Sequence, residues 1–152
     1  MENQNVIESL NTKDVVINKV LYTGKVHVDG GREGFAKSQD GLLDTALASP
    51  GSKDKGTNPE QLFAAGWAAF FIGAMKHNAP GLHIALPSDT SIDAEVDLAV
   101  ANTGFSLQAR LHVYLPGLTL EEAKMVIYAA HETCPYSKAT RGNINVQINV
   151  VI

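Results

Sequence analysis

Hydrophobic and polar residues alternate along two neighbouring segments in the second half of the chain, 92–100 and 105–115. Alternation with a period of two is typical of a β-strand that buries one face. Asn102-Thr103-Gly104 supplies a turn between the two segments, which together predict a long β-hairpin. The same alternation returns over 144–152 and predicts a final strand.

The stretch 62–75 is almost wholly apolar, which predicts a buried helix that runs to about residue 76. Its start has two interpretations. Thr57 caps it and Glu60 completes a capping box, or Asn58 caps it and Pro59 takes the first helical position. So little polar surface in a small domain indicates that a partner subunit covers part of this helix. The apolar run has 14 residues, too few to span a bilayer.

A second helix is predicted to open at the capping box Thr119-x-x-Glu122 and to close at Cys134-Pro135. Its buried stripe consists of apolar residues at helical spacing: Ala123, Val126, Ile127 and Ala130.

The N-terminal third predicts a β-meander. Residues 15–28 are β-branched and aromatic, and a glycine-rich turn follows them. Short strands are expected over 34–37 and 42–47. Strands, helix, strands, helix and strand, without a βαβ repeat, define an α+β fold class.

Composition limits the possible partners and location. With 152 residues, 45% of them hydrophobic, the chain fits a single domain, which we place at 15–152 after a flexible, polar arm over 1–14. A net charge of −4 without a basic cluster argues against nucleic acid and membrane surfaces as partners. The single cysteine excludes an intrachain disulfide and, with no secretory signal at the N-terminus, predicts a cytoplasmic location.

Cys134 has two interpretations at this point. Most free cysteines are small buried hydrophobes, whereas a functional thiol needs a reactive partner. His131 lies three residues earlier, but a His-x-x-Cys pair alone falls short of the four ligands that zinc requires. We therefore expect no metal ion.

Arg32 and Glu60 also have a structural and a functional interpretation. Alone, Arg32 is a solvated charge in a glycine turn, and Glu60 stabilises a helix start. Together they form an ion pair that holds a guanidinium ready to stabilise a thiolate or polarise a peroxide oxygen. The apolar pattern predicts four aromatic residues in the core or at an interface: Phe63, Trp67, Phe70 and Phe71.

Four motifs occur in order: GGREG at 30–34, DGLLD at 40–44, TNPEQLFAAG at 57–66 and CPYSKATRGN at 134–143. With this order and spacing, the chain resembles the organic hydroperoxide resistance (Ohr) branch of the OsmC/Ohr family over nearly all of 15–152. The resemblance implies an OsmC/Ohr-like fold and an intertwined homodimer with two active sites at the subunit interface. It also implies thiol-dependent reduction of organic hydroperoxides without a bound cofactor, and recycling by dihydrolipoyl groups on lipoylated proteins.

The resemblance implies roles for individual residues. Arg32 would stabilise the attacking thiolate, Glu60 would hold Arg32 in place, and Cys134 would be the resolving cysteine. We place three aromatic residues in the substrate pocket: Phe63, Phe71 and Tyr136.

The chain departs from the family at Phe70, which occupies the position of the peroxidatic cysteine. A phenyl ring is no nucleophile, and it fills space that a peroxide needs. Three hypotheses follow: an Ohr-family protein with a disabled peroxidase centre, a non-catalytic binder of hydrophobic acyl or lipoyl ligands in the dimer pocket, or a one-cysteine peroxidase that uses Cys134. Whether the chain is an active enzyme stays open at this point.

Overall fold

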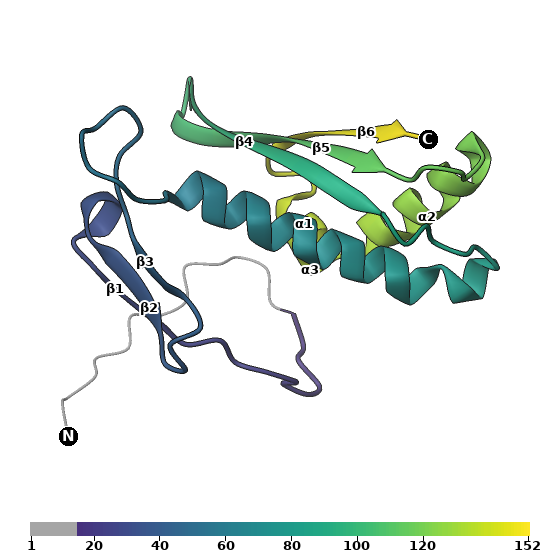
Figure 1. Cartoon of the computed structure of the whole chain (residues 1–152), viewed down its shortest axis with the longest axis horizontal. Helices are drawn as coiled ribbons and strands as arrows, with labels where there is room; N and C mark the ends of the chain where they lie inside the picture. The colour runs from purple at the N-terminus through teal and green to yellow at the C-terminus, as the bar shows by residue number, and fades with distance from the viewer. Residues whose placement is uncertain (1–14) are drawn as a thin grey trace.

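The computed structural model describes residues 15–152, so the arm expected over 1–14 lies outside the described residues. Figure 1 shows the β4–β6 sheet over one side of the long helix α1, and the small β1–β3 sheet near the start of that helix. The order of elements confirms the predicted α+β class. In chain order they are β1 (Val26–Asp29), η1 (Gly31–Glu33), β2 (Phe35–Ser38), β3 (Asp44–Ala46), α1 (Pro59–Asn78), η2 (Pro80–Leu82), β4 (Ser91–Ala101), β5 (Gly104–Tyr114), α2 (Leu120–Thr133), α3 (Pro135–Thr140) and β6 (Asn145–Val151).

The β4–β6 sheet is the scaffold on which both long helices pack. β4 and β5 are antiparallel along their whole length, which confirms the predicted hairpin. β6 is also found as predicted, but it pairs parallel to β5, with α2 and α3 forming the crossover between them. The direction of this pairing lies outside the sequence prediction, because alternation identifies a strand and not its neighbour.

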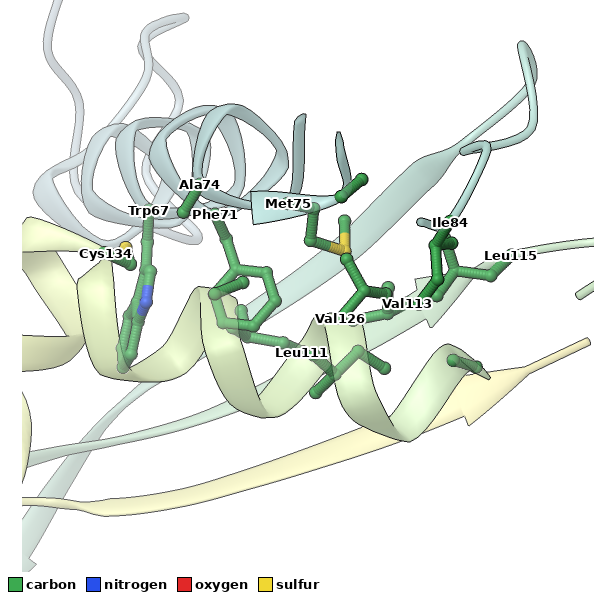
Figure 2. Packing of buried hydrophobic residues seen from close by; sticks show 14 of the residues in the cluster. Trp67, Phe71, Ala74, Met75, Ile84, Leu111, Val113, Leu115, Val126 and Cys134 are labelled. Atoms are coloured by element: carbon green, nitrogen blue, oxygen red, sulfur yellow. The ribbon is translucent and has the colours of Figure 1, made fainter. Parts of the chain in front are cut away.

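Apolar side chains from α1, α2 and one face of this sheet meet in a single core (Figure 2). Trp67, Phe71 and Met75 are spaced four residues apart on α1, so they share one helix face, and all three are fully buried. All four residues of the predicted α2 stripe are buried, which confirms that stripe. Within 15–152 no helix is long and apolar enough to cross a lipid bilayer.

Side-chain caps fix where the helices begin. The Asn58 side chain accepts a hydrogen bond from the backbone N–H of Gln61 at 2.9 Å, and Pro59 opens α1. Of the two predicted starts, the Asn58 cap is therefore right. The predicted capping box of α2 is complete, with Thr119 and Glu122 each bonding the other's backbone.

The strand predicted over 15–28 is wrong for most of its length. Only Val26–Asp29 form β1, while residues 15–25 have no regular secondary structure and are exposed. Leu21 and Tyr22, for example, are 86% and 81% exposed. β-branched composition favours a strand, but a strand also needs a neighbouring backbone, and in the described chain only Lys25, at the end of this segment, has one, through the N–H of Gln39.

The second helix ends before Cys134-Pro135 as predicted, but a further helix that the sequence pattern does not predict, α3, follows directly. Cys134 has an extended backbone (φ −63°, ψ 125°), as expected for a residue that precedes proline. Pro135 then takes the first position of α3, where its missing N–H is no loss. The proline therefore both ends one helix and starts the next.

Candidate functional site

A tight glycine turn between β1 and β2 presents Arg32. Gly30 has a φ of 73°, in the left-handed region that favours glycine. A side chain at Gly34 would overlap the backbone, since its Cβ would lie 1.7 Å from the carbonyl oxygen of Asp29. The turn is therefore specific to glycine at these two positions, and it includes the short helix η1, in which Arg32 lies.

Two backbone contacts bring this turn to the start of α1. The N–H of Leu47 donates to the carbonyl of Gly34 at 2.8 Å, and Leu47 also forms a parallel bridge with Thr57. The chain then enters α1 within three residues, which places Glu60 beside the Arg32 turn.

Arg32 and Glu60 form a bidentate ion pair, as the sequence suggested. Arg32 Nη1 and Nη2 donate to Glu60 Oε1 and Oε2 at 2.9 and 3.1 Å. The hydrogen bonds that Arg32 donates lower the pKa of Glu60, and the same bonds raise the pKa of Arg32. The Glu60 side chain is 14% exposed and that of Arg32 is 40% exposed, so part of the guanidinium is accessible to a second ligand.

A second group of site residues lies further along α1, around the ring of Tyr136. Tyr136 stacks on Phe63 with ring centroids 5.4 Å apart, and the ring of Phe70 meets Tyr136 edge-on at 5.0 Å. Gly66, between these two phenylalanines on α1, lets the tyrosine approach, because a Cβ there would lie 3.0 Å from the Tyr136 ring. Phe70 itself is 46% exposed.

An open, apolar hollow of about 550 Å³ adjoins Phe70. Most of its wall is the small-residue face of α1, and Pro135 closes it on the α3 side. His77 supplies its polar rim. The hollow therefore reaches the proline that follows Cys134.

Cys134 lies inward from this hollow. It is fully buried and belongs to the core cluster, at whose Trp67 end Figure 2 labels it. Phe71 is also fully buried in that core, so its place in a substrate pocket stays a prediction. His131 has a buried Nδ1 with no hydrogen-bond partner among residues 15–152, and burial lowers its pKa.

The chain thus assembles two separate groups of site residues, which we call half-sites. One is the aromatic cluster around Tyr136, and the other is the Arg32–Glu60 ion pair. Phe63, Phe70 and Tyr136 come together next to the Cys134–Pro135 junction. Glu60, which holds Arg32, precedes Phe70 by ten residues on the same helix, or about 15 Å along its axis. Within one chain the guanidinium is therefore not brought to the Phe70 ring.

One pair of residues at this site is not predicted from the sequence. Trp67 Nε1 donates to Ser137 Oγ at 3.2 Å, and both side chains are fully buried. The apolar pattern predicts Trp67 only as a core or interface aromatic. The only signal for Ser137 is its place in the motif that begins at Cys134, three residues earlier.

Comparison with known proteins gives a consistent result. The family model described as OsmC-like protein matches residues 51–149. The organic hydroperoxide resistance protein of Xanthomonas axonopodis pv. citri is 46% identical over 136 residues, covering 87% of this chain and 96% of the relative. The crystal structure of the organic hydroperoxide resistance protein OhrB of Bacillus subtilis superimposes with a TM-score of 0.82 at 43% identity, covering 87% of this chain and all of that chain.

A Vibrio cholerae relative, solved with captopril bound in one of its active sites, has a TM-score of 0.80 at 36% identity. It covers 88% of this chain, and 94% of its own length is matched. Family model, sequence relatives and solved structures agree, and the chain belongs to the OsmC/Ohr family, close to the organic hydroperoxide resistance proteins.

Proposed function

We propose that this chain is an Ohr-family protein of organic hydroperoxide detoxification whose thiol peroxidase centre is disabled by Phe70. The observation that carries the proposal is the position of the Phe70 ring, edge-on to Tyr136 and beside the Cys134–Pro135 junction. This is the place from which a thiol would attack a peroxide and then meet Cys134. The Arg32–Glu60 ion pair supports the same interpretation, because it retains the electrostatic part of such a centre.

The chemistry explains why one side chain decides the activity. A thiolate attacks one peroxide oxygen, the O–O bond breaks, and the departing alkoxide takes up a proton to give an alcohol. The sulfenic acid formed condenses with a second thiol, which releases water and leaves a disulfide for an external dithiol to reduce. Phe70 has no lone pair for the first step, and the fully buried Cys134 is poorly placed to take it over.

We propose further that the protein is a homodimer whose sites combine residues of two chains. The separation of about 15 Å between Glu60 and Phe70 along α1 leaves each chain with two incomplete half-sites. An antiparallel approach of two α1 helices would bring the Arg32–Glu60 pair of one protomer towards Phe70 of the other. The exposed apolar segment 15–22 supports an extensive contact of this kind, since apolar surface on such a scale marks an interface.

By the same family argument, the natural reductant for thiol peroxidase chemistry at this site would be a dihydrolipoyl group on a lipoylated protein. The same argument predicts a location in the cytoplasm. The test supplies that reductant directly. We expect Phe70→Cys, assayed with a bulky organic hydroperoxide and dihydrolipoamide, to reduce the hydroperoxide orders of magnitude faster than the unmodified chain does. Phe70→Ser is the matched control, since it opens the same space without an oxidisable sulfur.

Three outcomes contradict the proposal. Brisk turnover by the unmodified chain would show that its centre is not disabled, and hydroperoxide-dependent sulfenic acid on Cys134 would identify a one-cysteine peroxidase. A folded Phe70→Cys variant without turnover would show that the pocket itself has diverged.

The hollow of about 550 Å³ favours one second candidate function, a non-catalytic binder of acyl or lipoyl ligands. Its walls are apolar and its rim carries His77, so a chain with a polar end group would fit. Thermal-shift measurements on the unmodified protein with octanoate and lipoamide test this function. Ligand-dependent stabilisation that Ala69→Trp removes would support it.

A further inference from the structure

Trp67 is unusual in the core because it makes a hydrogen bond there. Its ring N–H, the only hydrogen-bonding group of the side chain, donates to Ser137 Oγ at 3.2 Å, and neither residue is exposed. A buried donor without a partner would be unfavourable, so this bond restricts where the indole and the hydroxyl can lie. It links α1 directly to α3.

The bond lies one helical turn from both positions that matter in the proposed chemistry. Trp67 precedes Phe70 by three residues on α1, and Ser137 follows Cys134 by three residues. Residues three apart on a helix lie on neighbouring turns of the same face. The link therefore sets the register between the segment that carries position 70 and the segment that carries Cys134.

Aromatic side chains pack around this hydrogen bond. The rings of Phe63 and Trp67 form a T-shaped pair with centroids 5.6 Å apart, and Phe63 also stacks on Tyr136, the residue before Ser137. Gly66 removes the one side chain that would hold Tyr136 away from α1. Sliding α3 along α1 would therefore break a hydrogen bond and separate two aromatic pairs at once.

We propose that Trp67 is a positioning residue that, through Ser137, holds Cys134 at the distance from position 70 required for disulfide closure. This role rests on the proposed function, in which a cysteine at position 70 and Cys134 would be the two thiols of a peroxidase centre. The simpler alternative is that Trp67 only fills the core. The two roles differ in what they affect, because core filling supports the stability of the whole fold and positioning supports the local proximity of two sulfurs.

The experiment measures that proximity in the Phe70→Cys background. In a glutathione buffer, the new thiol and Cys134 pass two electrons and two protons to oxidised glutathione, giving one protein disulfide and two reduced glutathiones. The midpoint of this equilibrium under native conditions gives the effective concentration of one thiol at the other. We expect Trp67→Phe to lower it about tenfold, the effect of losing one buried hydrogen bond of ordinary strength, and Ser137→Ala to lower it equally.

Controls separate the roles. Combining Trp67→Phe with Ser137→Ala adds little if the two side chains act through one bond. Met75→Leu, a change of a fully buried residue two turns further along α1, lowers stability without altering the effective concentration. In the unmodified chain Trp67 is the sole tryptophan, so Ser137→Ala shifts its emission if the hydrogen bond exists.

The inference fails alone if Phe70→Cys forms its disulfide and Trp67→Phe leaves the midpoint where it was. It also fails if Met75→Leu moves the midpoint as far as Trp67→Phe does. Absence of any disulfide in folded Phe70→Cys would instead overturn the proposed function together with this inference. Measuring Phe70→Cys without a second substitution is enough to detect that result.

Discussion

Replacing Gly66 by alanine tests the packing of the aromatic cluster, because two opposing effects meet at this residue. In a helix interior, alanine is favoured over glycine by about 0.8–1.0 kcal/mol. At Gly66, however, the added Cβ would lie 3.0 Å from Cε2, 3.2 Å from the hydroxyl oxygen and 3.5 Å from Cζ of Tyr136. Carbon atoms prefer about 3.5–4.0 Å, so the tyrosine must move.

The tyrosine has little freedom to move. Its ring is stacked on Phe63 at 5.4 Å and meets the edge of Phe70 at 5.0 Å. Overpacking at a fixed site of this kind costs about 1–3 kcal/mol. Subtracting the helix-propensity gain, we expect Gly66→Ala to destabilise the protein by about 0–2 kcal/mol.

A double-mutant cycle isolates the contact. In a Tyr136→Ala background the obstacle is gone, so Gly66→Ala should stabilise the protein by about 1 kcal/mol, and the coupling between the two changes should be about 1–3 kcal/mol. Urea unfolding at one fixed protein concentration measures all four variants, since assembly would otherwise change the apparent stability. Equal stabilisation by Gly66→Ala in both backgrounds would refute this account of the cluster.

Three further changes have expected outcomes. Asn58→Ala removes the cap that accepts from Gln61 and should lower the free energy of unfolding by about 1 kcal/mol in urea titrations, and no loss would contradict the cap. Glu60 has a lowered pKa, so the stability it contributes is complete above its unfolded value of 4.5 and is lost as pH falls through the lower folded value. Arg32→Gln should weaken this acid dependence, and an unchanged pH profile would count against the ion pair. Burial lowers the pKa of His131 from 6.5, so the protein should lose stability as pH falls below about that value, and His131→Gln should remove that slope in pH-dependent melting curves.

Local patterns predicted the elements whose stability is decided locally. The hairpin of β4 and β5 follows from alternation on both sides of a short turn, and the caps at Asn58 and Thr119 follow from side chains that bond their own helix. In each case the partner lies in the same helix turn or in the next segment of the chain, so the sequence displays both members of the interaction.

Elements that depend on distant partners were predicted less well. Residues 15–24 have strand composition but no strand to pair with in the described chain, and composition does not report that absence. The parallel placement of β6 beside β5 depends on how the α2–α3 crossover packs. At the site, the Arg32–Glu60 pair was suggested by charge and motif, while the Trp67–Ser137 bond joins residues 70 positions apart and left no sequence signal of its own.

Phe70 also explains why likeness of fold says little about activity in this chain. Its side chain is 46% exposed on α1, outside the buried layer formed by Trp67, Phe71 and Met75. A substitution there neither opens a cavity in the core nor strains it, so the fold remains superimposable on that of a resistance protein with a TM-score of 0.82. The side chain at position 70 thus lies at the edge of the core face of α1, where it is accessible to solvent. Under the proposed function, a phenyl ring in place of a thiol at this position would remove the nucleophile and leave the buried layer of α1 unchanged.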